Sequence, residues 1–313
     1  MLLDLALVAA GLTVLLLAGD LLVRGAANLA LRLGIPALMV GLTVVAFGTS
    51  APELLVTIKA VLSDADGLAL GNVVGSNIAN ILLVIGLPAL IAPMLIGRAY
   101  LRDYLIMLAA TALFGALATT GAIDRWQALV LLAGFALFMA DSIRRGRRAR
   151  AANADLPAIE AQTGLPRLIL FLALGLIGLP LGANLLVGGA VSIAASLGVS
   201  DVMIGLTIVA VGTSLPELAT TVMAAIRREG GVALGNIIGS NIFNLLLILG
   251  VAGLFGRVDM PAQMLVLDFW VMLAAALVLA PFLWRRAAVG RIAAMALLLA
   301  YAGYIWSLTV IGG

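Results

Sequence analysis

Long apolar stretches alternate with short polar ones along almost the whole chain. About 20 consecutive apolar residues in a helix are enough to cross the hydrocarbon core of a bilayer. Ten stretches meet this condition, at residues 3–31, 37–62, 67–90, 103–120, 125–143, 166–196, 201–226, 231–253, 264–284 and 289–310. We therefore expect an all-α polytopic membrane protein with ten transmembrane helices.

One hydrophilic segment divides this pattern into equal halves. It begins with the arginine-rich run RRGRRAR at Arg144 and continues to Pro166, where the sixth stretch begins. We expect a first five-helix repeat at residues 1–143, a cytoplasmic linker at 144–165 and a second repeat at 166–313. Because five is odd, the second half must enter the membrane from the opposite side, which predicts two inverted five-helix repeats.

The halves also share a sequence. Residues 41–87 and 205–251 align without a gap at a constant offset of 164, and 26 of the 47 aligned positions are identical. The duplicated polar residues fall in two clusters, GTSxPE and GNxxGSNIxN. A polar cluster repeated inside two apolar halves indicates that both halves build one site.

The first cluster predicts a broken helix. Pro52 has no backbone N–H and its ring clashes with the carbonyl four residues earlier, while Gly48 adds flexibility. We expect the break near residues 46–50, where it would free the carbonyls of Ala46 and Thr49. Free carbonyls inside a membrane are tolerated only where protein or a water-filled cavity satisfies them.

Oxygen-bearing side chains share helical faces beside this break. Glu53 follows Thr49 by four residues and Ser50 by three, and Ser76 and Asn80 are four apart in the next helix. The second half repeats the pattern with Ala210, Thr213, Ser214, Glu217, Ser240 and Asn244. Oxygen ligands without nitrogen or sulfur suit hard cations such as calcium and sodium. Broken helices at matching positions of inverted halves are where transporters place their ion sites.

A charge near the bilayer centre costs about 2.5 kcal/mol or more, so Glu53 and Glu217 are expected to be functional.

The other duplicated or charged residues are expected to have structural roles. The motif glycines are expected to serve helix packing: Gly71, Gly75, Gly235 and Gly239. The remaining motif asparagines are expected to bond between helices: Asn72, Asn77, Asn236 and Asn241. Four aspartates lie near predicted helix ends, where interfacial water would solvate them: Asp20, Asp103, Asp141 and Asp268.

Composition agrees with a membrane location and excludes several functions. Hydrophobic residues form 64% of the chain, charged residues 11%, and the mean hydropathy is +1.23. The hydrophobic fraction is well above that of a soluble domain, and the charged fraction is well below it. The chain has no cysteine and no histidine, which argues against disulfides, thiolate chemistry and histidine-bound zinc. We expect no enzyme, no prosthetic group, no nucleic acid and no protein partner. The apolar amino terminus lacks a basic segment, which favours a retained helix over a signal peptide.

The basic residues predict the orientation. If the arginines after residue 143 are cytoplasmic, alternating spans place 15 of the 18 basic residues inside. Only Lys59, Arg125 and Arg257 fall outside. We therefore expect a multi-pass protein of the inner (plasma) membrane, with both termini and the tip at residues 63–66 facing the periplasm.

The motifs resemble a known family. GTSAPE followed by GNVVGSNIAN, and again GTSLPE followed by GNIIGSNIFN, resemble the two alpha-repeats of the cation/calcium exchanger superfamily, in its prokaryotic sodium/calcium branch. The resemblance implies a diamond-shaped cluster of ion sites at mid-membrane and a first and sixth helix that slide past the other eight. It implies these ion ligands: Ala46, Thr49, Ser50, Glu53, Ser76, Asn80, Ala210, Thr213, Ser214, Glu217, Ser240 and Asn244.

The resemblance implies an antiporter that exchanges calcium for sodium, with alternatives left open. Proton-coupled relatives carry an acidic residue where this chain has Gly75 and Gly239, and some potassium-dependent relatives carry aspartate at the position of Asn244. Both departures favour sodium as the coupling ion over protons or potassium. A cation channel would share an oxygen-lined site, but it needs a continuous pore.

Overall fold

The computed structural model describes residues 1–152, 164–198, 210–261 and 264–311, and these residues form an almost entirely helical molecule. Within them, eight helical stretches are long and apolar enough to cross a membrane. Their bounds are Leu2–Leu33 (α1), Asp66–Ile91 (α5), Arg98–Ala118 (η2 and α6), Arg125–Ala152 (α7), Leu165–Ser196 (α8), Gly230–Phe255 (α12, η4 and α13), Met264–Arg285 (η5, α14 and α15) and Arg291–Ile311 (α16).

One more span, the second in chain order, is bent where the sequence predicts a break. It comprises α2 (Ala37–Val40), the π-helical turn η1 (Gly41–Val45), α3 (Ala46–Thr49) and α4 (Ala51–Leu62), and its two parts meet at 44°. The remaining expected span is the seventh in chain order, 201–226. It is described only from residue 210, as α10 (Ala210–Thr213) and α11 (Leu215–Ile226). Nine of the ten expected spans are thus present in the described residues, and the count of ten stays a prediction.

Two further spans also contain π-helical turns, one in the middle of its span and one at the start. The eighth span consists of α12 (Gly230–Ile242), η4 (Phe243–Ile248) and α13 (Leu249–Phe255). The ninth consists of η5 (Met264–Asp268), α14 (Phe269–Val278) and α15 (Ala280–Arg285). π-helical turns often occur at functional sites, and here η1 and η4 each lie on a span that carries a duplicated motif.

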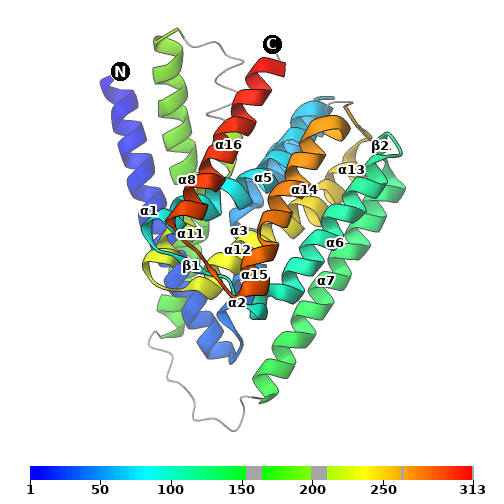
Figure 1. Cartoon of the computed structure of the whole chain (residues 1–313). Coiled ribbons are helices and arrows are strands. Elements are labelled where there is room, and N and C mark those ends of the chain that lie inside the picture. Colours follow the sequence, from blue (N-terminus) through cyan, green and yellow to red (C-terminus); the bar gives the residue numbers. More distant parts are fainter. Residues whose placement is uncertain (153–163, 199–209, 262–263, 312–313) are drawn as a thin grey trace.

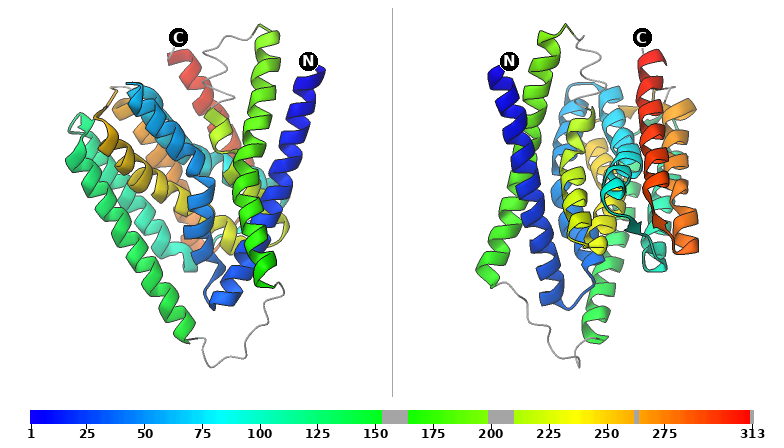
Figure 2. Two further views of the ribbon diagram at one scale, coloured as in Figure 1. Left: turned by 180° about the vertical axis from the view of Figure 1, so that it is seen from behind. Right: turned by 60° about the vertical axis from the view of Figure 1, so that its left-hand side comes forward.

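The helices form a central group with a long pair along one edge. α1 and α8 lie side by side there (Figure 2), and α5, α11 and α12 occupy the centre with α6 and α7 on the far side (Figure 1). The start of α1 and the end of α16 lie at one end of the molecule, whereas α7 ends and α8 begins at the opposite end. This relative placement is the one that alternating spans require.

Two short antiparallel pairs reflect the internal repeat. β1 (Met94–Leu95) pairs with β4 (Ala288–Val289), and β2 (Ala122–Ile123) pairs with β3 (Val258–Asp259). The offset of 164 carries β1 onto β3, and it carries β2 to within two residues of β4. Each pair therefore joins a connector of one half to a connector of the other.

Glycines bring α1 and α8 into backbone contact. A Cβ atom at Gly182 would lie 2.8 Å from the nitrogen of Leu15, and one at Gly11 would lie 2.4 Å from the nitrogen of Leu186. Small residues permit this approach, on which van der Waals packing between membrane helices depends. The long pair at the edge is thus held together by close backbone packing.

The structure corrects the environment expected for Asp103 and extends the helix expected at 125–143. Asp103, assigned to interfacial water, is fully buried and accepts two hydrogen bonds from Arg145, at 2.6 and 3.2 Å. Residues 144–152 belong to α7, so the helix continues into the segment expected as linker. Arginine is a good helix former, and the partner that Arg145 finds on α6 helps to extend the helix.

An ion pair links α1 to the end of α11. Asp20 of α1 pairs with Arg227, the residue directly after α11, and also with Arg24 at 2.8 Å. The aligned positions in the other half are Asn184 and Ser63. This charged contact therefore has no ionic counterpart at the aligned residues.

The glycine contact between α1 and α8 generates a test. Gly182→Ala should destabilise the protein by about 1–3 kcal/mol, because the added methyl group forces two backbones apart. Gly188→Ala is the matched control on the same helix, since Gly188 is exposed with nothing within 4 Å of an added Cβ. Thermal unfolding in detergent measures both variants, and equal unfolding temperatures would contradict the packing described here.

Candidate ion-binding site

Both copies of the first motif break their helix in the same way. Ser50 has φ −85° and ψ 4°, and Ser214 has φ −86° and ψ 3°, outside helical geometry in each case. Pro52 and Pro216 follow in the first turn of the next helix. Since proline offers no N–H to the carbonyl four residues earlier, Gly48 and the matching Gly212 lose that backbone partner. The two halves thus present equivalent polar breaks.

One expected consequence of the break is not observed. The carbonyl of Ala46 accepts the backbone N–H of Ser50 at 3.0 Å and lies 3.4 Å from the hydroxyl of Thr49. It is therefore not free, although a carbonyl oxygen has a second lone pair. Ala210 begins α10, and its side chain lies outside what the structure describes.

The two glutamates are buried at these breaks. Glu53 and Glu217 are each 1% exposed. Oε1 of Glu217 accepts hydrogen bonds from Ser50 at 3.1 Å and from Ser240 at 3.4 Å. Ser50 belongs to the first half and Ser240 to the second, so one carboxylate joins both halves of the chain.

Glycines on α12 allow the halves to approach closely. A Cβ at Gly235 would lie 2.5 Å from the carbonyl oxygen of Leu38, and one at Gly239 would lie 2.7 Å from Cβ of Ala46. The bent span of the first half therefore packs directly on the helix that carries Ser240. This agrees with the packing role expected for these two glycines.

Six buried oxygens from the predicted ligands have no hydrogen-bond partner among the described residues. They are Glu53 Oε2, Ser76 Oγ, Asn80 Oδ1, Ser214 Oγ, Glu217 Oε2 and Asn244 Oδ1. Buried polar atoms are nearly always paired, and an unpaired one costs about 1–3 kcal/mol. Three of the six come from each half. A set of unpaired carboxylate, hydroxyl and amide oxygens has the chemistry of a hard-cation site.

The predicted residues lie on helices that contact one another. Thr49 ends α3, Glu53 lies in the first turn of α4, and Ser76 and Asn80 lie on α5. The second half places its members on α10, α11, α12 and η4, with Ser214 between α10 and α11: Ala210, Thr213, Ser214, Glu217, Ser240 and Asn244. Contacts connect α4 with α5, α5 with α11, and α11 with α12. The described residues contain no group of three or more His, Cys, Asp or Glu side chains that could bind a metal, so neutral oxygens must complete any coordination.

Of the four asparagines expected to bond between helices, three do so, whereas Asn241 donates to the carbonyl of Ile237 within α12 at 2.7 Å. Asn72 donates to the backbone carbonyl of Glu53 at 3.1 Å and to Thr57 Oγ1 at 2.9 Å. Asn244 donates to Asn77 Oδ1 at 3.2 Å. Thr57 was not singled out from the sequence, although its duplication as Thr221 was a signal that could have found it.

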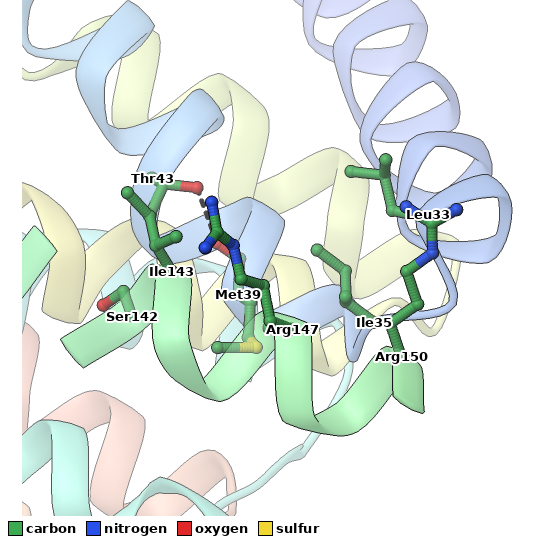
Figure 3. A pocket seen from close by; sticks show the side chains of 9 residues that line it. Leu33, Ile35, Met39, Thr43, Ser142, Ile143, Arg147 and Arg150 are labelled. Atoms are coloured by element: carbon green, nitrogen blue, oxygen red, sulfur yellow. Dashed lines mark hydrogen bonds between the residues drawn. The ribbon is translucent and has the colours of Figure 1, made fainter. Parts of the chain in front are cut away.

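A cavity near the linker end of the molecule is separate from these residues. It has a volume of about 230 Å³ and lies between the end of α1, the start of the bent span and α7 (Figure 3). Leu33, Met39 and Thr43 line it together with Arg147 and Arg150. Because none of the twelve predicted ligands lines it, the cavity is not the candidate ion site.

Comparison with known proteins matches both halves of the chain to one protein family. The family described as "Sodium/calcium exchanger protein" matches residues 3–143 and again 167–310. The putative antiporter CaxA of Alkalimonas amylolytica is 38% identical, and the alignment covers 94% of this chain and 95% of CaxA. The sodium/calcium exchanger MaX1 of Methanosarcina acetivorans is 33% identical, with 94% and 95% covered.

Two further relatives agree. The inner membrane protein YrbG of Escherichia coli K12 is 37% identical, and the alignment covers 91% of this chain and 90% of YrbG. The solved structure of the sodium-calcium exchanger NCX_Mj, soaked with sodium and calcium, superposes with a TM-score of 0.85 at 32% identity. That match covers 98% of this chain and 99% of NCX_Mj. The chain thus belongs to the sodium/calcium exchanger family of membrane transporters.

Proposed function

We propose that this protein exchanges calcium for sodium by alternating access, with the ions bound between the two alpha-repeats. The observation that carries the proposal is the set of six buried, unpartnered oxygens beside two buried carboxylates, divided equally between the halves. Cation ligation would satisfy atoms that the protein leaves without partners. The family and the likeness to NCX_Mj support the transport of cations.

The proposed ligands are the twelve residues expected from the motifs. They are Ala46, Thr49, Ser50, Glu53, Ser76, Asn80, Ala210, Thr213, Ser214, Glu217, Ser240 and Asn244. The alanines would contribute backbone carbonyls and the others side-chain oxygens. Calcium takes six to eight oxygen ligands, so the set suffices for one calcium ion or for several sodium ions that share ligands.

The charge of the site supplies the condition for exchange. Glu53 and Glu217 give an empty site two negative charges, which are costly to enclose away from water. One calcium ion neutralises them, and two or three sodium ions bring the site close to neutrality. Loaded forms should therefore pass between the inward- and outward-facing states while the empty form does not. Each bound ion set acts by favouring the occluded state.

The moving part in this proposal is the pair α1 and α8. The two helices pack backbone to backbone through Gly11 and Gly182, lie along one edge of the molecule (Figure 2) and belong to different halves. A pair held together this closely can slide as one body past the remaining helices. Movement at an edge would change access to the central site while leaving its ligands together.

Sodium is the proposed coupling ion. Asn80 and Asn244 carry no charge, and Gly75 and Gly239 stand where proton-coupled relatives have acidic residues. The site thus has two carboxylates and no additional proton carrier among its predicted ligands. The second candidate, a cation channel, would conduct without a counter-ion, and a flux assay separates the two.

The glutamates provide the central test. Glu53→Gln or Glu217→Gln should lower calcium uptake into proteoliposomes at least about a hundredfold, because half of the negative charge that offsets the desolvation of calcium is lost. Asp64→Asn, an exposed carboxylate with φ 54° in a turn that asparagine tolerates, should transport normally. Uptake at the normal rate by either glutamine variant would remove the proposed site.

Coupling is tested by the choice of gradient. Calcium accumulation in vesicles should require an outward sodium gradient and fall to background when potassium or choline replaces sodium. Radiolabelled calcium measures this directly, and empty vesicles provide the control. Strong uptake driven by a proton gradient in sodium-free buffer would instead assign the chain to proton-coupled exchange.

Orientation is tested with single cysteines in this cysteine-free chain. Ser63→Cys should react with an impermeant thiol reagent added outside intact cells, whereas Arg148→Cys should react only after the membrane is opened. Both side chains are exposed, so a difference in labelling reports the side of the membrane. Labelling of the residue 148 variant in intact cells would reverse the proposed topology.

A further inference from the structure

The two copies of the second motif make different hydrogen bonds although their residues are the same. In the first half, Asn72 donates to the carbonyl of Glu53 and to Thr57, both within its own half. In the second half, Asn236 instead accepts a hydrogen bond from Thr49 at 3.0 Å, across the boundary between the halves. Asn72 and Asn236 are aligned by the repeat offset of 164.

Unpaired atoms mark the difference. Thr221 corresponds to Thr57 and lies 15 residues before Asn236, as Thr57 lies 15 before Asn72. Both threonines are 0% exposed. Yet Thr221 Oγ1 and Asn236 Nδ2 have no hydrogen-bond partner among the described residues. The second half thus holds a donor and an acceptor whose counterparts in the first half are bonded to each other.

Residue type does not explain this asymmetry, because asparagine, threonine and glutamate recur at the aligned positions. A difference in conformation between the halves does explain it. In a transporter built from inverted repeats, each half can adopt the conformation that the other half holds in the opposite access state. The bonds made by one half in the present conformer are then those the other half makes after the transition.

We propose that Asn72 and Asn236 are positioning residues that exchange partners between the two access states. In the present conformer Asn72 holds the backbone of Glu53 and Asn236 contacts Thr49. In the opposite conformer Asn236 donates to the carbonyl of Glu217 and to Thr221, while Asn72 leaves Thr57 and turns toward the second half. This inference rests on the proposed alternating-access exchange, and it adds residues that are not among the twelve proposed ligands.

The exchange links the ion site to the direction of access. Each asparagine fixes the backbone of the glutamate in its own half in one access state only. The backbone of Glu53 is therefore held in the present conformer and that of Glu217 in the opposite one. Both threonines are buried, and a buried hydroxyl without a partner is unfavourable, so the state in which each hydroxyl is bonded has the lower free energy at that residue. The two threonine–asparagine bonds therefore favour opposite states.

Two nearly isosteric variants test the proposal with opposite expected signs. Thr57→Val removes a bond made in the present conformer and should favour the opposite state, whereas Thr221→Val removes an unpaired hydroxyl here and should favour the present one. The measurement is the half-saturating calcium concentration at each membrane face, in oriented vesicles with sodium exchange. The ratio of the two values should move about fivefold in opposite directions, the change expected from one hydrogen bond.

Controls separate positioning from structural damage. Thr111→Val changes a buried threonine whose hydroxyl bonds only within its own helix, to Met107 at 3.0 Å, and should leave the ratio unchanged. Thr57→Ser and Thr221→Ser keep the hydroxyl and should restore the wild-type ratio. The smaller Thr57→Ala and Thr221→Ala pair gives the same signs without steric conflict and serves if a valine variant does not fold.

The outcomes distinguish this inference from the proposed function. If the wild-type protein does not exchange calcium for sodium, the proposed function fails. If wild-type exchange is intact but the two threonine variants shift the ratio in the same direction, or no further than Thr111→Val does, the partner exchange is overturned. Opposite shifts, with the double variant returning close to the wild-type ratio, would support it.

Discussion

The structure depends on two carboxylates placed in an apolar interior without a basic residue beside them. None of the ion pairs among the described residues involves Glu53 or Glu217. Asp103 is equally buried, but Arg145 neutralises it. Desolvating an unpaired carboxylate costs several kcal/mol. The described part of the chain thus pairs no positive charge with these carboxylates, and in the proposed mechanism the transported cations supply it.

The helix breaks and the close glycine contacts make this arrangement geometrically possible. Each break places a serine and a glutamate at the end of one short helix, where the proline has removed part of the backbone ladder. Gly235 and Gly239 then let α12 approach the bent span so closely that hydroxyls from both halves reach Glu217. A continuous helix or a larger residue at either glycine would separate the two groups of oxygens.

Sequence reasoning predicted the features that follow from local rules or from duplication. The break before Glu53 follows from Pro52, and the division into halves follows from the repeated motifs. Contacts between distant residues were not predictable in this way. The pairing of Asp103 with Arg145 joins residues on two different helices, so the carboxylate was wrongly assigned to interfacial water. The bond from Asn72 to Thr57 depends on how α5 packs on α4, and this packing was not specified by either motif alone.

The ion pair between Asp20 and Arg227 makes the two ends of the molecule chemically unlike. The aligned residues, Asn184 and Ser63, cannot form an ionic contact with each other. If α1 slides past α11, this pair exists in one access state and not in the other, and no ionic contact between the aligned residues replaces it. The two access states of such an exchanger then differ in free energy, so the apparent affinities for the ions differ between the two membrane faces, although the gradients alone still decide the net direction of transport.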